Sequence, residues 1–124
     1  MEQKILNVGV ISCSGMAQSH MLAVQAHEQA RLVAICDVDE EKLREAGEKL
    51  GVDARYTDYR DLLRHPELDA VIIVTPDQLH REMVEAALAA NKHVLCEKPL
   101  ALTREDLCAI VAAGKKSDRK LMVG

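Results

Sequence analysis

The chain alternates short apolar runs rich in β-branched residues with longer segments of helical periodicity, and this alternation constrains its fold most. The strand-like runs occupy residues 5–11, 32–36, 54–56, 70–74, 93–96 and 121–123. Helix-like segments fill the intervals, with no repeat and no Pro/Gly/Ser-rich linker. Strands separated by crossover helices pair in parallel with right-handed connections. The sequence therefore predicts an α/β fold, a doubly wound, mostly parallel six-stranded sheet with helices on both faces.

Local signals predict where several helices begin and end. Asp39 can cap a helix with an acidic first turn, and Gly51 is typical of a residue that closes one. Thr103 and Asp106 form a variant of the capping box at the start of the last helix. We expect that helix to bury a stripe made of Leu107, Ile110, Val111 and Gly114.

The composition excludes several classes of function. The chain has 16 Lys and Arg residues against 20 Asp and Glu, so it offers no basic footprint for a nucleic-acid backbone. Two Tyr, no Phe and no Trp leave few rings on which single-stranded bases can stack. No apolar run approaches the roughly 20 residues that span a bilayer, and the opening MEQKILN lacks the apolar region of a signal peptide. We expect a cytoplasmic protein with neither nucleic acid nor membrane as partner.

The cysteines and histidines show no metal-binding spacing. Four cysteines without C-x-x-C pairing are expected to be free thiols in a reducing compartment: Cys13, Cys36, Cys96 and Cys108. Cys13 lies near a predicted helix start, where a thiol pKa is lowered, so a redox switch is the alternative to plain packing. His20 and His27 share one helix face and are explained more simply by packing than by ligation. We expect no metal site.

Function is expected just after the strands, because ligands of doubly wound sheets bind at the carboxyl ends near the switch in strand order. A dinucleotide fold carries G-x-G-x-x-G/A in its first turn, where this chain has Ser12, Cys13, Ser14, Gly15, Met16 and Ala17. Serines replace the first two glycines, and a serine held at positive φ costs roughly 1–2 kcal/mol. Free N–H groups at the following helix start still suit an anion. The turn is therefore either a phosphate-binding loop or a plain strand–helix turn.

Asp37 ends the second predicted strand, about 20 residues after that turn, the spacing of the ribose-binding acid in dinucleotide folds. A carboxylate there can accept both ribose hydroxyls of an adenosine and repels a 2′-phosphate, which favours NAD over NADP. The alternative is a helix-entry residue that competes with Asp39 for the cap.

Two further strand ends carry candidate chemistry. Pro99 biases Lys98 toward an extended backbone, which can aim the ammonium group into the crevice. Beside a nicotinamide cation, partial burial would lower the pKa of Lys98 and suit it to acid–base work on an alcohol. His80 starts a helix beside the same crevice and can donate to substrate or cofactor. The alternatives are a solvated lysine and a partly exposed helix residue.

Four stretches together resemble the N-terminal domain of the Gfo/Idh/MocA oxidoreductases, the glucose–fructose oxidoreductase and inositol dehydrogenase family. They read VGVISCSGMAQSH (8–20), ICDVD (35–39), VIIVTPDQLH (71–80) and HVLCEKPLALT (93–103). The resemblance covers the whole chain. It implies a Rossmann fold and NAD(P)-dependent oxidation of a hydroxyl on a sugar, polyol or related small molecule.

The resemblance also implies roles for individual residues. Residues 12–17 would face the pyrophosphate, and Asp37 the adenosine ribose. The nicotinamide side would be formed by Thr75, Pro76 and His80. Glu97 and Lys98 would sit at the nicotinamide and substrate, with Lys98 as the proton-transfer residue.

Two departures from the family's pattern shape our expectations. The family has glycines where this chain has Ser12 and Ser14, and it has a second α/β domain for substrate and oligomerisation after this point. We expect residues 1–124 to be one dinucleotide-binding domain that does not turn over by itself. The alternatives are a Rossmann scaffold, non-catalytic or engineered, with impaired nucleotide binding, and a chain that self-associates through apolar surface near its last strand.

Overall fold

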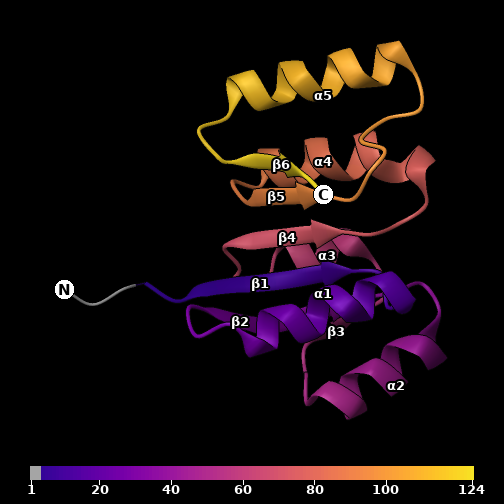
Figure 1. Cartoon of the computed structure of the whole chain (residues 1–124), viewed down its shortest axis with the longest axis vertical. Coiled ribbons are helices and arrows are strands. Elements are labelled where there is room, and N and C mark those ends of the chain that lie inside the picture. The colour runs from indigo at the N-terminus through magenta and orange to yellow at the C-terminus, as the bar shows by residue number, and fades with distance from the viewer. Residues whose placement is uncertain (1–3) are drawn as a thin grey trace.

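The computed structural model describes residues 4–124 and contains one six-stranded sheet (Figure 1). The strand order is β3-β2-β1-β4-β5-β6, and every neighbouring pair is parallel. The strands are β1 (Leu6–Ile11), β2 (Ala30–Cys36), β3 (Arg55–Tyr56), β4 (Ala70–Ile73), β5 (His93–Cys96) and β6 (Leu121–Val123). The helices are α1 (Gly15–Ala26), α2 (Glu40–Leu50), α3 (Tyr59–Leu63), α4 (His80–Ala89) and α5 (Arg104–Lys116), with a 3₁₀ turn, η1, at Asp77–Leu79.

The strand order places the switch in chain direction between β1 and β4. From β1 the chain winds outward to β3, returns to the centre at β4, and winds the other way to β6. All strands therefore present their carboxyl ends at one edge of the sheet, the right-hand edge in Figure 1. The predicted doubly wound α/β sheet is confirmed, and it is parallel throughout.

Two separate hydrophobic cores lie on the two faces of the sheet, and β4 contributes side chains to both. Ala70 and Ile72 point into the core under α1 and α2, whereas Val71 and Ile73 point into the core under α3, α4 and α5. This is why the strand is apolar at every position: a parallel strand between two helical layers has no solvated face. Because β4 is packed on both faces, the loop that follows it at the carboxyl edge starts from a fixed position.

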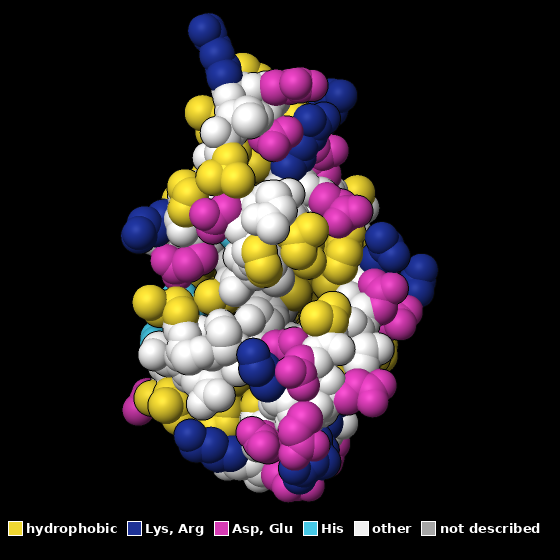
Figure 2. Space-filling view, turned by 90° about the vertical axis from the view of Figure 1, so that its right-hand side faces the viewer, with side chains coloured by type: hydrophobic (Ala, Val, Ile, Leu, Met, Phe, Trp, Pro, Cys, Tyr) yellow, Lys and Arg dark blue, Asp and Glu magenta, His cyan; other side chains and the backbone are white. Residues whose placement is uncertain are grey.

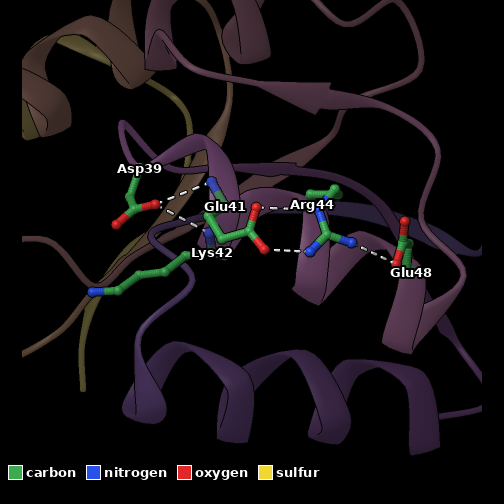
Figure 3. A network of polar contacts seen from close by, with 5 residues as sticks. All are labelled: Asp39, Glu41, Lys42, Arg44 and Glu48. Carbon is green, nitrogen blue, oxygen red and sulfur yellow. Dashed lines mark hydrogen bonds and ion pairs between the residues drawn. The ribbon is translucent and has the colours of Figure 1, made fainter.

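Both ends of α2 follow the sequence signals closely, and Figure 3 shows the cap at its start and the ion pairs that follow. The Asp39 side chain accepts hydrogen bonds from the backbone N–H groups of Glu41 and Lys42, at 3.0 and 3.1 Å. Arg44 then bridges Glu41 and Glu48 on the exposed face of the helix. Gly51 closes the helix at φ 69°, a left-handed conformation that suits glycine.

Of the buried stripe predicted for α5, only Ile110 is confirmed, and Gly114 is half-buried. Thr103 caps the helix as expected, its hydroxyl accepting the N–H of Asp106 at 3.1 Å. Ile110 is fully buried, but Leu107 and Val111 are 42% and 43% exposed. The helix lies at the edge of the sheet and packs mainly against α4, which covers Ile110 but leaves the flanking apolar positions open to solvent.

Two further findings bear on the classes excluded by composition. Within residues 4–124, no helix is long and apolar enough to cross a membrane. In the same range, no group of three or more His, Cys, Asp and Glu side chains is placed to hold a metal ion.

Candidate functional site

A cavity of about 340 Å³ opens at the carboxyl edge, where the ends of β1 to β4 meet. Figure 2 looks onto this edge and shows apolar side chains gathered across its middle, with charged side chains around them. The residues that line the cavity come from four strand ends, η1, α3 and α4: Ile11, Ser12, Cys36, Asp37, Val38, Thr57, Asp58, Tyr59, Thr75, Pro76, Leu79 and Met83. The sequence pointed to Ser12, Asp37, Thr75 and Pro76, and it missed the others.

The cavity combines apolar walls with a polar rim. Tyr59, Leu79 and Met83 supply flat or flexible apolar surface, and the Thr75 hydroxyl donates to the Met83 sulfur at 3.3 Å. Asp37 brings a carboxylate to the same space. Apolar walls with a few placed polar groups are typical of small-molecule sites. A planar base could lie against the apolar walls, and a hydroxylated sugar attached to it could reach the polar groups.

Asp37 is held in place by two backbone N–H groups. Its Oδ2 accepts from Cys13 N and its Oδ1 from Asp39 N, both at 2.8 Å. An ionised carboxylate has about four acceptor positions, so each oxygen retains capacity for a ligand hydroxyl. The helix-entry alternative is partly right, because Asp37 bonds the Asp39 amide. Asp39, however, caps α2.

The two serines in the turn after β1 have different backbone conformations. Ser12 has φ 106°, the region that L residues rarely adopt, whereas Ser14 has φ −70° and an extended backbone. The strain expected of a serine in this turn therefore applies to Ser12 alone. The Ser12 hydroxyl accepts the Ser14 N–H at 3.2 Å and donates to the Ser14 hydroxyl at 3.1 Å.

The first turn of α1 leaves backbone donors free beside the cavity. Within the described chain, the N–H groups of Gly15, Met16 and Ala17 have no acceptor. Ser14 occupies the N-cap without a side-chain hydrogen bond, and the space above Gly15 is open. Unpartnered donors and the helix dipole together favour an anion at this position. The expected contribution of Cys13 differs, since its N–H already serves Asp37.

The thiols near the site are buried and unreactive. Cys13, Cys36 and Cys96 are buried free thiols, and Cys108 is an exposed one. Burial, reinforced by the charge of Asp37, raises the pKa of Cys13 to about 12. The lowered pKa considered for Cys13 at a helix start is therefore wrong, because burial outweighs the helix dipole. The redox-switch alternative loses its basis.

His80 does not lie where we expected it. Its side chain is fully buried, and its two ring nitrogens face backbone carbonyls, Nδ1 that of Pro99 at 2.8 Å and Nε2 that of Thr75 at 3.0 Å. Both polar atoms are thereby occupied, and no surface of the ring remains for a ligand. His80 is therefore not a residue that contacts substrate or cofactor, as expected, but a buried one that joins the loops after β4 and β5.

The loop after β5 carries Glu97 and Lys98 at the same edge. The Glu97 N–H donates to the Ile73 carbonyl at 2.9 Å. Lys98 is exposed, so the partial burial expected of it is not found, and its ammonium group has no hydrogen bond or ion pair to residues 4–124. Glu97 Oε2 lies 2.8 Å from His20 Nε2 on α1. This hydrogen bond lowers the pKa of Glu97. The sequence, which favoured packing over metal ligation for His20, did not predict this contact.

A larger cavity, about 660 Å³, lies between α4 and α5, at the opposite edge of the sheet. It is bounded by the ends of the two helices and by the loops that lead into β5 and β6, and four alanines contribute to its walls. No strand carboxyl end reaches it. We therefore place the candidate site at the smaller cavity, where charge, free donors and strand ends converge.

The strand order, the acid after β2 and the free donors of α1 define a dinucleotide-binding Rossmann domain. The chain belongs to the GFO/IDH/MocA oxidoreductase family with an NAD-binding Rossmann fold, whose pattern matches residues 6–124. The family resemblance seen in the sequence is confirmed.

Several proteins that the chain is similar to are dehydrogenases. The chain is 39% identical to a myo-inositol 2-dehydrogenase from Thermotoga maritima over 96% of this chain and 36% of that protein. It is 39% identical to a D-apiose dehydrogenase from Paraburkholderia graminis over 92% of this chain and 30% of that one. The crystal structure of scyllo-inositol dehydrogenase from Lactobacillus casei with bound NAD(H) and scyllo-inositol matches with a TM-score of 0.87 and 29% identity, over 98% of this chain and 36% of that chain. The chain thus spans about a third of these relatives' length.

Proposed function

We propose that this chain is the NAD(H)-binding domain of a dehydrogenase that oxidises a hydroxyl group on a sugar, polyol or related small molecule. The observation that carries the proposal is the position of Asp37, whose carboxylate faces a mostly apolar cavity beside the unpartnered donors of α1. The substrate class rests on the named relatives, which are inositol and apiose dehydrogenases.

The cavity at the ends of β1 to β4 is proposed to hold the adenosine. The adenine ring would lie against Tyr59, Leu79 and Met83, and the ribose hydroxyls would donate to the Asp37 carboxylate. Asp58 lines the same cavity. A 2′-phosphate would meet the negative charge of both aspartates, which favours NAD over NADP.

The first turn of α1 is proposed to hold the pyrophosphate. The N–H groups of Gly15, Met16 and Ala17 would donate to its oxygens, as helix N-termini do for phosphates in this fold. Ser12 and Ser14 lie beside this path. Their hydroxyls bond one another in the structure and can turn toward an oxygen.

The loops after β4 and β5 are proposed to form the nicotinamide side. Thr75 and Pro76 would shape one wall, and Glu97 and Lys98 the other. A bound nicotinamide supplies the hydride acceptor for alcohol oxidation. The Lys98 amine would take the hydroxyl proton as the substrate C–H bond gives up its hydride to the nicotinamide. Residues 1–124 are proposed to bind the cofactor without turnover by themselves, in the cytoplasm.

Calorimetric titration of NAD and NADP into the 124-residue chain tests the proposal. We expect saturable binding of NAD and binding of NADP that is weaker by at least tenfold. Absence of NAD binding by the chain, and also by a Ser12→Gly, Ser14→Gly variant, would overturn it. Binding by the variant alone would assign the defect to the turn and leave the cavity assignment standing.

A second candidate is a Rossmann module that binds no nucleotide and self-associates. It is favoured by the positive φ of Ser12 and by apolar side chains exposed on α5 and β6, namely Leu107, Val111, Met122 and Val123. Sedimentation equilibrium distinguishes the two: a monomer at high concentration that binds NAD rejects the second candidate.

A further inference from the structure

Lys98 lies between two residues that are each bonded to a histidine from a different helix. Glu97, before it, contacts His20 of α1, and Pro99, after it, contacts His80 of α4. The lysine side chain is exposed, and its ammonium group has no partner among residues 4–124. The turn that carries the ammonium group is therefore held on both sides while the ammonium group is left available.

The Glu97 side of the turn is anchored twice. Its backbone N–H donates to the Ile73 carbonyl at the end of β4, at 2.9 Å. Its carboxylate meets His20 Nε2 at 2.8 Å, and the two side chains are only 20% and 23% exposed. A carboxylate–imidazole hydrogen bond of this length is of the stronger, charge-assisted kind. The contact joins the helix after β1 to the loop after β5.

The Pro99 side is anchored by a buried ring. His80 places one nitrogen on the Pro99 carbonyl and the other on the Thr75 carbonyl, so it links the loop after β5 to the loop after β4. With one ring proton the imidazole donates to one of the two carbonyls, and with two it donates to both. Pro99 has no N–H, so its carbonyl is the only backbone group that can fix this residue.

We propose that His20 and His80 are positioning residues that together hold the 97–99 turn and so fix the direction in which Lys98 points. This rests on the proposed function, in which Lys98 moves the proton of the substrate hydroxyl. Proton transfer needs a donor–acceptor approach within about 3 Å, and misplacement by about 1 Å can cost a hundredfold in rate. A long lysine side chain on an unanchored loop would not meet that demand.

The two histidines differ in burial, and this difference determines which of them can be replaced in the experiment. His20 is partly exposed at the edge of α1, so its replacement is compatible with folding. His80 is fully buried, and its loss can unfold the chain. The variants of His20 therefore carry the test, and His80→Gln, which retains an amide donor, supports it.

The test is ¹⁵N relaxation of the 124-residue chain without nucleotide. In the original chain we expect the Lys98 amide to have an order parameter near ~0.85, as in rigid backbone. His20→Leu should lower it below ~0.6, the range of flexible loops, while the β1 and β4 amides stay rigid. His20→Gln should restore most of the order, because its amide can donate to Glu97. His27→Gln, at the far end of α1, is the matched control and should change nothing at Lys98.

Unchanged order at Lys98 in both His20→Leu and His80→Gln would overturn the inference. So would a loss of order in His20→Leu that His20→Gln does not reverse, because a purely steric role of the ring would then explain it. The measurement uses no cofactor, so a chain that fails to bind NAD would still decide it. Conversely, NAD binding with a mobile 97–99 turn would leave the proposed function intact and reject the positioning role.

Discussion

The Asp37 carboxylate accepts the backbone N–H of Cys13 at 2.8 Å, which ties the end of β2 to the turn that follows β1. The same carboxylate lines the cavity proposed for adenosine. One side chain thus bonds the strained turn and lines the cavity proposed for the ligand. A change at Asp37 should alter both the turn and the affinity for nucleotide.

Asp37→Asn should weaken NAD binding by about tenfold or more, since a hydrogen bond to a charged group contributes about 1.5–3 kcal/mol. It should also narrow the gap between NAD and NADP, because the charge that repels a 2′-phosphate is gone. Calorimetry with both nucleotides measures the two effects. Asp39→Asn is the matched control: asparagine caps helices as well as aspartate does, so affinity should not change. Equal losses in the two variants would contradict the assignment of Asp37.

Ser12→Gly and Ser14→Gly should have opposite effects on stability. Ser12 has φ 106°, and glycine relieves a cost of about 1–2 kcal/mol there while adding about 0.4–1 kcal/mol of chain entropy to the unfolded state. We expect its free energy of unfolding to rise by about 0.5 kcal/mol. Ser14 has φ −70°, so glycine gains nothing and should lower stability by about 0.5–1 kcal/mol. Urea unfolding measures both, and changes of the same sign would show that the strain at Ser12 is absent.

The cap of α2 offers a stability test away from the site. Asp39→Ala removes the acceptor of two backbone N–H groups and should cost about 1 kcal/mol. Glu48→Gln, at the other end of the network in Figure 3, breaks only an exposed pair with Arg44 and should cost no more than about 0.5 kcal/mol. Thermal unfolding at low salt compares them. A larger loss in Glu48→Gln would show that the ion pairs, and not the cap, hold this helix.

The thiols predict both a labelling pattern and a pH dependence. Burial raises the pKa of Cys13, Cys36 and Cys96 to about 12, so only exposed Cys108 should react with a thiol reagent at neutral pH in the folded chain. In the unfolded chain these thiols ionise from their ordinary value of 9.0 upward. Between that value and about 12 the folded state binds more protons, so stability should fall as the pH rises.

Counting the thiols that react with a labelling reagent tests the first prediction, and alkaline denaturation tests the second. One fast-reacting thiol per folded chain and four in denaturant are expected. Rapid labelling of Cys13 in the folded chain would revive the redox switch. A Cys36→Ala variant should lose part of the alkaline destabilisation, because one of the groups that bind protons in the folded state is removed.

The sequence predicted the architecture because alternation, caps and breakers are local signals. Asp39, Gly51 and Thr103 each act within a few residues of the helix end that they mark, and all three do so as expected. The stripe of α5 failed because periodicity gives the apolar face of a helix but not which neighbouring elements cover that face. Leu107 and Val111 remain exposed for that reason.

Site residues could be predicted from the sequence where they directly follow a strand and stand at a recognised spacing. Asp37 follows an apolar strand at a known spacing, so it stood out. Tyr59 reaches the cavity from α3, and His20 reaches Glu97 from 77 positions earlier in the chain. Neither has a local signal, because strand order brings them together. The prediction for His80 failed because the sequence gives its position at the start of a helix beside the crevice but not the direction of its ring, which is buried in the protein.

Chemical-shift mapping of NAD on the ¹⁵N-labelled chain tests the central claim most directly, since the cavity at the strand ends and the larger one between α4 and α5 are lined by different residues. We expect the largest shifts at the amides of Gly15, Met16, Asp37, Val38 and Tyr59, with none in the groove between α4 and α5. Shifts concentrated at Ala109, Ala112 and Lys116 would place the nucleotide in the larger cavity and contradict the account.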